Sequence, residues 1–285
     1  MSHVKVKDLS YSYGEGEGKV LKDINLEIEK GEFVLLTGPS GCGKTTLCRC
    51  FNGLIPHFYG GKIDGEVSVA GLRVSEHQIH EMATVVGFVF QNPENQLFAL
   101  TVERDVAFGL ENLGLPKDEI SKRVTWALKV VGMEEFRFAA PFELSGGQQQ
   151  RVAIASVLAM QPEVIVLDEP TSFLDPAAAL NIFQILKRLN DELHMTIILV
   201  EHRLELASAY IDRILLMNEG SILLDGDPRS ILSQEESKLL GIGVPKVIRL
   251  FRMLRAGGIS FEHYPLTPSE GAMAIRRLVK GYDQG

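Results

Sequence analysis

The chain has 285 residues, of which 45% are hydrophobic and 23% are charged, and its formal net charge is −8. These proportions are typical of a folded globular protein, and the acidic balance argues against a protein that holds nucleic acid on a broad basic face. The length indicates about two structural units, and no apolar run approaches the roughly 18 residues that span a bilayer.

The cysteines and the first residues indicate the compartment. All three cysteines lie between Cys42 and Cys50, an odd and clustered set that favours a reducing cytosol over a disulfide framework. Residues 1–5 lack the apolar core of a signal peptide. We therefore expect neither a secreted disulfide scaffold nor a transmembrane channel.

The N-terminal part alternates apolar and polar residues as strands do. Apolar side chains recur over residues 4–9, 20–28 and 67–69, with glycine-rich turns between them, which predicts an antiparallel sheet. From residue 33 the pattern changes to short, continuously apolar runs separated by helical stretches. The runs are 33–36, 85–90, 164–167 and 197–200, helices are expected at 101–113 and 117–131, and a hairpin is expected at 214–224.

Strands that are buried on both faces have this continuously apolar pattern. We therefore expect an α/β fold with a mostly parallel core sheet that is covered by helices. A main domain is expected over residues 1–230, with a helical subdomain at about 92–160. A small C-terminal appendage of two short amphipathic helices is expected over residues 231–285.

A polar segment follows each of the four buried runs. A glycine-rich segment at 38–46 follows the first run, Gln91 the second, Asp168 and Glu169 the third, and a segment with His202 the fourth. Because ligands bind outside the carboxyl ends of the strands in an open parallel sheet, we expect these segments to converge on one pocket.

The first segment matches the phosphate-binding pattern G-x-x-x-x-G-K-[ST]. Its glycines let the backbone wrap a phosphate chain, Lys44 would reach the β- and γ-phosphates, and Thr45 would offer its hydroxyl to Mg²⁺. The nucleotide is expected to contact Gly38, Pro39, Ser40, Gly41, Cys42, Gly43, Lys44, Thr45 and Thr46.

The other strand ends supply the chemistry. Asp168 is the expected second contact of Mg²⁺, Glu169 would polarise the attacking water, and His202 would orient the water or the γ-phosphate. The catalytic residues expected from these positions are Glu169, His202 and Lys44, and the expected metal ligands are Thr45 and Asp168.

A second anion cradle begins a predicted helix at residues 145–148. Ser145 is a suitable N-cap, and Gly146 and Gly147 expose backbone amides at the positive end of the helix, followed by Gln148. One nucleotide cannot easily occupy both cradles. We therefore expect a dimer in which Ser145 of one chain faces the γ-phosphate that Lys44 of the other chain holds.

With these motifs in order, the chain resembles the ATP-binding subunit of an ABC transporter over about residues 3–228. Residues 38–45 match Walker A, Gln91 the Q-loop, 144–148 the LSGGQ signature, 164–169 Walker B, 172–175 the D-loop and His202 the switch histidine. The resemblance implies a P-loop NTPase fold, ATP and Mg²⁺ as ligands, and an aromatic side chain that stacks on adenine. Tyr13 is the best match for that side chain, and Tyr11 is the second. The resemblance also implies that Gln91 is a catalytic residue that contacts the nucleotide and is a ligand of the metal.

Segments 51–57, 90–98 and 106–114 resemble the energy-coupling factor (ECF) importers. ATPases of that group pair as homo- or heterodimers, bind a membrane scaffold subunit, and drive uptake of vitamins or transition-metal ions through a separate substrate-binding membrane protein. The resemblance implies a peripheral subunit on the cytoplasmic face of the membrane, with no nucleic-acid partner. Glu201 and Phe173 depart from the commoner pattern, in which a hydroxyl residue and a small residue are frequent, but neither removes a catalytic group.

Two other functions are weighed against this one. A soluble ABC-type ATPase of DNA repair, chromosome structure or translation would carry a long coiled coil or two cassettes, and the segment between Lys44 and Ser145 shows no sustained heptads. A non-catalytic adaptor that ATP switches is disfavoured because Glu169 and His202 are both present.

Overall fold

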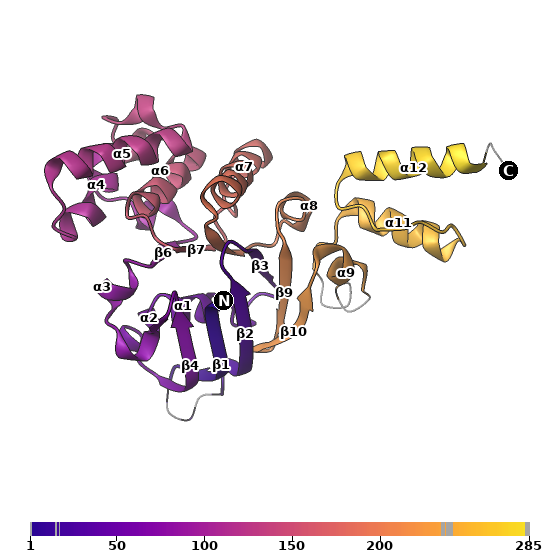
Figure 1. The fold of residues 1–285 in the computed structure, drawn as a ribbon, viewed down its shortest axis with the longest axis horizontal. Helices are drawn as coiled ribbons and strands as arrows, with labels where there is room; N and C mark the ends of the chain where they lie inside the picture. The colour runs from indigo at the N-terminus through magenta and orange to yellow at the C-terminus, as the bar shows by residue number, and fades with distance from the viewer. Residues whose placement is uncertain (1, 15, 17, 235–236, 238–241, 283–285) are drawn as a thin grey trace.

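An antiparallel sheet and a mostly parallel sheet form the fold (Figure 1). The computed structural model describes residues 2–14, 16, 18–234, 237 and 242–282. The antiparallel sheet has the strand order β2-β1-β4-β5. Its strands are β1 (Ser2–Ser12), β2 (Leu21–Glu29), β4 (Lys62–Val69) and β5 (Leu72–Arg73). Val4 pairs with Ile28 on one side and with Val69 on the other, so the antiparallel sheet predicted from residues 4–69 is confirmed.

The larger sheet has the order β10-β9-β3-β8-β7-β6. Its strands are β3 (Phe33–Thr37), β6 (Val86–Val89), β7 (Val164–Asp168), β8 (Thr196–Val200), β9 (Arg213–Asn218) and β10 (Ser221–Gly226). All neighbouring strands run parallel except β9 and β10, which form the predicted antiparallel hairpin. The four predicted buried runs correspond to β3, β8, β7 and β6, which are neighbours in this sheet.

Alternate residues of β3 contribute to two hydrophobic cores. Phe33 and Leu35 pack with helices on one face of the sheet, whereas Val34 and Leu36 pack with the antiparallel sheet on the other. Successive side chains of a strand point to opposite faces. Burial on both faces is therefore the reason why this strand is apolar at every position.

Helices cover the parallel sheet and extend from both of its ends (Figure 1). They are α1 (Lys44–Phe51), α2 (Leu54–His57), α3 (Ile79–Met82), α4 (Val102–Asn112), α5 (Lys117–Val131), α6 (Gly146–Ala159), α7 (Pro176–Leu193), α8 (Leu204–Ala207), α9 (Pro228–Ser233), α11 (Lys246–Ala256) and α12 (Pro268–Tyr282). Short 3₁₀ turns are η1 (Val74–Glu76), η2 (Pro93–Asn95), η3 (Glu134–Phe136) and η4 (Pro141–Glu143). The predicted helices at 101–113 and 117–131 are α4 and α5.

The helices at the two ends form separate groups. Helices α4 and α5 pack on α6 at one end, and α11 and α12 lie at the other end beyond α9 (Figure 1). Ile248 and Phe251 of α11 join the hydrophobic core that contains Leu232 of α9. Residues 235, 236, 238–241 and 283–285 of the predicted appendage lie outside the described residues. Among the described helices, none has both the length and the apolar character that crossing a bilayer requires.

Candidate functional site

The register of three parallel strands brings their polar ends to one edge of the sheet. Val200, the last residue of β8, pairs with Leu36 of β3 and with Asp168 of β7. The segments after these strands therefore start side by side, as the sequence predicts for a parallel sheet. A cavity of ≈ 320 Å³ lies here, lined by Thr37, Gly38, Pro39, Ser40, His202, Ile242 and Gly243.

The glycine-rich loop is folded tightly between β3 and α1. Gly38 has φ +149°, and a Cβ atom there would lie 2.1 Å from the carbonyl oxygen of Met217. Lys44 is the first residue of α1 and is buried, and its Nζ donates to the carbonyl oxygens of Gly38 (3.0 Å) and Pro39 (2.8 Å). The loop therefore encloses the lysine head at the positive N-terminus of the helix, which is a suitable place for anionic oxygens.

The remaining residues of the loop are placed by the same fold. Gly43, with φ +107°, precedes α1, and Thr46 on α1 lies within 3.1 Å of the Tyr13 hydroxyl. Burial raises the pKa of the Cys42 thiol, and the charge of Lys44 partly opposes this effect. Ser40 and Gly41 are exposed at the tip of the loop.

Asp168 is the last residue of β7. Its carboxyl is buried, which raises its pKa, and a hydrogen bond with the Thr45 side chain acts in the opposite direction. Its Oδ1 atom is buried and has no hydrogen-bond partner among the described residues. An orphaned carboxylate oxygen beside a hydroxyl is a donor set that fits Mg²⁺, which prefers one or two carboxylates in nucleotide sites.

Glu169 is the centre of a hydrogen-bonded cluster. Its Oε1 lies 2.8 Å from Nε2 of His202, and its Oε2 accepts from Nε2 of Gln91 (2.9 Å) and from the hydroxyl of Ser172 (3.0 Å). Its backbone is left-handed, with φ 49°, a conformation that costs about 1 kcal/mol or more for a non-glycine residue and is common at functional sites. The structure thus brings together three side chains that the sequence assigns to catalysis, from β6, β7 and β8.

The Ser145–Gln148 segment forms the start of α6. Ser145 is the N-cap, its Oγ accepts from the amide of Gln148, and its amide donates to Oε1 of Gln148 (2.8 Å). Ser145 and Gly146 are exposed, and Gly147 is half-buried. Within the part of the chain that the structure describes, no hydrogen bond or ion pair joins this segment to the glycine-rich loop. Gly146 instead lines a smaller cavity with Gln91 and Phe173.

The two candidate aromatic residues differ in their exposure. Tyr11 is fully buried in the antiparallel sheet, and its hydroxyl donates to the carbonyl oxygen of Gly60. Tyr13 is half-buried at the end of the same strand, and its hydroxyl accepts from Arg49 (3.3 Å). A ring must have a free face to stack on a base, so the buried Tyr11 is poorly placed and Tyr13 remains the candidate.

Sequence reasoning gave no role to Thr171, Glu201 and Arg203, which surround the cluster. The hydroxyl of Thr171 donates to Oε2 of Glu201, and Arg203 donates to the carbonyl oxygens of Ser172 and Leu174. The only signal in the sequence was the acidic residue before His202. Its partner Thr171 could not be inferred because that residue follows a different strand.

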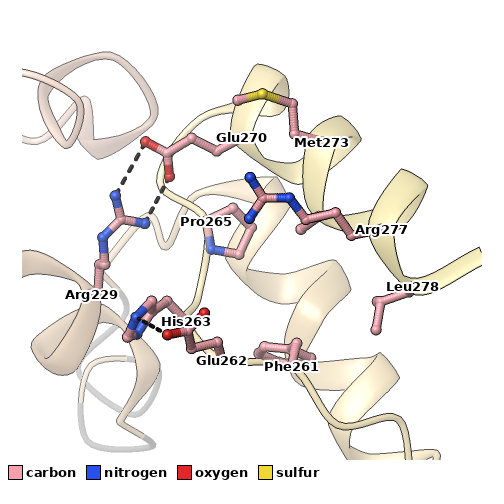
Figure 2. Close-up of a pocket in the computed structure, with 10 residues that line it drawn as sticks. Arg229, Phe261, Glu262, His263, Pro265, Glu270, Met273, Arg277 and Leu278 are labelled. Carbon is pink, nitrogen blue, oxygen red and sulfur yellow. Dashed lines mark hydrogen bonds and ion pairs between the residues drawn. The ribbon is translucent and has the colours of Figure 1, made fainter. Parts of the chain in front are cut away.

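A larger cavity lies elsewhere, in the C-terminal part of the chain. Figure 2 shows this pocket of ≈ 780 Å³ between α9 and α12, in which Arg229 pairs with Glu270 and His263 with Glu262. None of the residues that the sequence assigns to the nucleotide site lines it. The pair Arg229–Glu270 connects α9 to α12 across this pocket.

Comparison with known proteins decides the family. The ABC transporter family matches residues 21–172 of the chain. The chain belongs to the ABC transporter family of ATP-binding domains. This match covers the glycine-rich loop, the signature segment and the acidic pair, which are the features that the site is built from.

Two relatives of this ABC cassette illustrate its range. A Methanosarcina mazei protein named as an ABC transporter ATP-binding protein is 51% identical over 253 residues, which are 88% of this chain and 43% of that protein. The chain therefore spans less than half the length of that relative. The energy-coupling factor transporter ATP-binding protein EcfA1 of Caldanaerobacter subterraneus is 44% identical over 272 residues, 94% of this chain and 96% of that one.

Solved structures of ABC cassettes share the fold. CbiO1 from Clostridium perfringens, described as part of the ABC transporter complex cbiONQ, has a TM-score of 0.76 and 37% identity, covering 88% of this chain and 98% of that one. The dimeric ATP-binding cassette MJ0796 bound to ADP and Pi has a TM-score of 0.69 and 34% identity, covering 79% and 99%. The predicted ABC ATPase fold is thereby confirmed.

Proposed function

We propose that this chain hydrolyses ATP and so powers a membrane importer of the energy-coupling factor type. The observation that carries the proposal is the Glu169 carboxylate, which Gln91, Ser172 and His202 contact beside the lysine loop. Three neighbours on two oxygens fix the orientation of this carboxylate. A fixed, half-buried base next to a phosphate-binding loop is the arrangement that phosphoryl transfer to water requires.

The chemistry follows from these placements. A water molecule attacks the γ-phosphorus of ATP and gives a proton to Glu169, while the bond from that phosphorus to the β–γ bridging oxygen breaks. The products are ADP and inorganic phosphate. Lys44 would contact the β- and γ-phosphates, His202 would contact the γ-phosphate, and Tyr13 would stack on adenine, with the rest of segment 38–46 around the phosphates.

The residues also fit a magnesium ion. Thr45, Gln91 and Asp168 would hold it, and when bound it would neutralise charge on the phosphate oxygens. The buried and unpartnered Oδ1 of Asp168 supports this assignment. Burial raises the pKa of this carboxyl, and a bound cation would stabilise its charged form.

The complete site requires a second chain, either identical or a paralogue. Ser145, Gly146, Gly147 and Gln148 present an exposed helix N-terminus that makes no hydrogen bond to the loop of the same chain within the described residues. In a dimer this segment would face the γ-phosphate held by Lys44 of the partner. The similarity to a cassette solved as a dimer with ADP and Pi supports this arrangement.

The membrane partner would dock on an apolar patch made of Phe98, Leu100 and Phe108. Phe98 and Leu100 are 67% and 74% exposed. The rings of Phe98 and Phe108 pack edge to face, with their centroids 4.7 Å apart. Asp105 is buried and fixes this loop, because its Oδ1 accepts from the amides of Phe98 and Ala99. Exposed aromatic patches of this kind mark protein interaction sites.

Docking beside the Gln91 segment would couple the membrane subunit to the nucleotide site. Gln91 is the start of the segment that leads to Phe98, and its side chain contacts Glu169. A helix of a scaffold subunit fits this position in the helix-in-groove mode. The chain would then act as a peripheral subunit at the cytoplasmic face of the membrane, and a separate membrane protein would bind the vitamin or transition-metal ion.

The proposal is tested by the Glu169→Gln variant, with Glu135→Gln as a matched control on the exposed surface. We expect Glu169→Gln to bind ATP with near-normal affinity but to hydrolyse it at least about 100-fold more slowly, and to accumulate as a closed dimer in size-exclusion chromatography. Near-normal hydrolysis by this variant would show that Glu169 is not the catalytic base. Absence of ATPase activity in the wild-type chain and in its purified membrane complex would reject the function.

A further inference from the structure

Glu201, the residue before His202, accepts three hydrogen bonds. Glu201 follows β8 and is 1% exposed. Its Oε1 accepts from the amides of His202 (2.9 Å) and Arg203 (3.0 Å), and its Oε2 accepts from the hydroxyl of Thr171 (2.5 Å). One carboxylate therefore connects the segment after β8 to the segment after β7.

Each of these two segments carries a side chain that contacts one carboxylate oxygen of Glu169. Thr171 is fully buried and precedes Ser172, whose hydroxyl contacts Oε2 of Glu169 at 3.0 Å. His202 follows Glu201 and contacts Oε1 of Glu169 at 2.8 Å. The distance from the imidazole to the base is thus set by how the two segments are held together.

Arg203 forms a second connection between the same segments. Its guanidinium donates to the carbonyl oxygens of Leu174 (2.9 Å) and Ser172 (3.5 Å). Glu201 and Arg203 therefore flank His202 and each reaches the segment after Glu169. Two connections on either side of one residue restrict both the position and the direction of its side chain.

We propose that Glu201 is a positioning residue that fixes the imidazole of His202 against Glu169. This inference rests on the proposed ATPase function for its catalytic consequence, although the geometry stands independently of it. A buried carboxylate is costly unless each oxygen is hydrogen-bonded, and here three donors compensate that cost. Because a displacement of about 1 Å can cost on the order of 100-fold in rate, loosening this connection should be visible in kcat.

A carboxylate is needed because one oxygen must serve each segment. A serine or threonine has a single oxygen on a shorter side chain, so it can satisfy the backbone amides or Thr171 but not both. A glutamine retains the shape, since its carbonyl oxygen can accept from the amides and its NH₂ group can donate to the hydroxyl of Thr171. Glu201→Gln is therefore the conservative variant, and Glu201→Ala removes the connection.

The kinetic experiment compares Glu201→Ala, Glu201→Gln, His202→Ala and the double variant Glu201→Ala/His202→Ala. We expect Glu201→Ala to lower kcat at least about tenfold with the KM for ATP changed less than about twofold, and Glu201→Gln to restore kcat to within about threefold of wild type. The double variant should be no slower than His202→Ala alone, because Glu201 acts through that residue. Multiplicative losses in the double variant, or a change in KM alone, would overturn the proposal.

A spectroscopic readout separates this proposal from the proposed function. The imidazole of His202 is observed by ¹H–¹⁵N NMR in wild type, Glu201→Ala and Thr171→Val, and the chemical shift of its Nε2 reports the contact with Glu169. We expect both variants to change this chemical shift, because the contact of Nε2 with the Glu169 carboxylate is lost, whether or not the chain hydrolyses ATP. If Glu201→Ala fails to fold, Thr171→Val tests the same connection. An unchanged Nε2 chemical shift in a folded variant would refute the positioning role.

Discussion

His202 Nε2 lies 2.8 Å from Oε1 of Glu169, although 33 residues separate them in the chain. They meet because Val200 pairs with Asp168 in adjacent parallel strands, so the segment after β8 begins beside the segment after β7. The amide of Glu169 also donates to the carbonyl oxygen of Val200 at 3.0 Å, which extends this pairing by one residue. The strand register thus places a base and an imidazole in contact at the edge of the sheet.

The glycine-rich loop should tolerate no side chain at Gly38. In Gly38→Ala the new methyl group would lie 2.1 Å from the carbonyl oxygen of Met217 in a left-handed conformation, so we expect a loss of about 2 kcal/mol or more in the free energy of unfolding. Urea denaturation measures this loss. Gly18→Ala is the control because nothing lies within 4 Å of its new atom, and equal stability of the two variants would contradict the tight packing of the loop.

The buried charge of Asp168 should lower the stability of the metal-free protein at neutral pH. Burial raises its pKa, so the folded state binds a proton more readily than the unfolded state, and stability falls as the pH rises above the ordinary value of 3.8. Asp168→Asn should therefore raise the Tm at pH 7 in the absence of metal, and this gain should shrink as the pH is lowered towards 3.8.

The same variant should lose the response to magnesium. Wild type should gain thermal stability from Mg²⁺ with ATP, since a ligand that binds only the folded state stabilises it, whereas Asp168→Asn should gain much less. Differential scanning calorimetry with and without Mg²⁺ measures both effects. Asp118→Asn, an exposed carboxylate, is the control and should behave as wild type. A lower Tm for Asp168→Asn without metal would show that the charge is compensated.

The ion pair between Arg229 of α9 and Glu270 of α12 should stabilise the fold only slightly, and this contribution should decrease at low pH. The hydrogen bond from Arg229 lowers the pKa of Glu270 (Figure 2), so its stabilising contribution is present above the ordinary value of 4.5 and is lost as the pH falls below it. Because both side chains are about one-third exposed, a double-mutant cycle of Arg229→Gln and Glu270→Gln should give less than about 1 kcal/mol at pH 7. Glu262→Gln serves as the exposed control, and coupling that persists unchanged at pH 3.5 would contradict this account.

The apolar patch should be needed for membrane attachment but not for hydrolysis. Phe98→Ser removes an exposed ring outside the nucleotide site, so we expect the isolated chain to keep its ATPase activity within about twofold while co-purification with the membrane subunits falls at least about tenfold. Phe58→Ser is a matched control because that ring is 70% exposed in a different part of the chain. Equal losses in both variants would indicate a general effect of exposed rings.

The sequence by itself determined the elements and the order of the polar strand ends. Continuous apolar runs predicted β3, β6, β7 and β8, because burial on both faces excludes polar residues from them. The parallel arrangement in turn required the segments that carry Lys44, Asp168 and His202 to share one edge. These inferences succeed because they depend on local periodicity and on a topological rule rather than on side-chain geometry.

Only the tertiary structure decided which of these groups touch. The order β3-β8-β7-β6 places His202 between the loop and the acidic pair, and it joins Glu201 to Thr171, a contact over 30 residues. Similarly, Tyr11 is buried where β1 pairs with β4, whereas Tyr13 lies beyond the end of β1 and is only half-buried. Such contacts depend on strand order and on rotamers, and neither leaves a periodic trace in the chain.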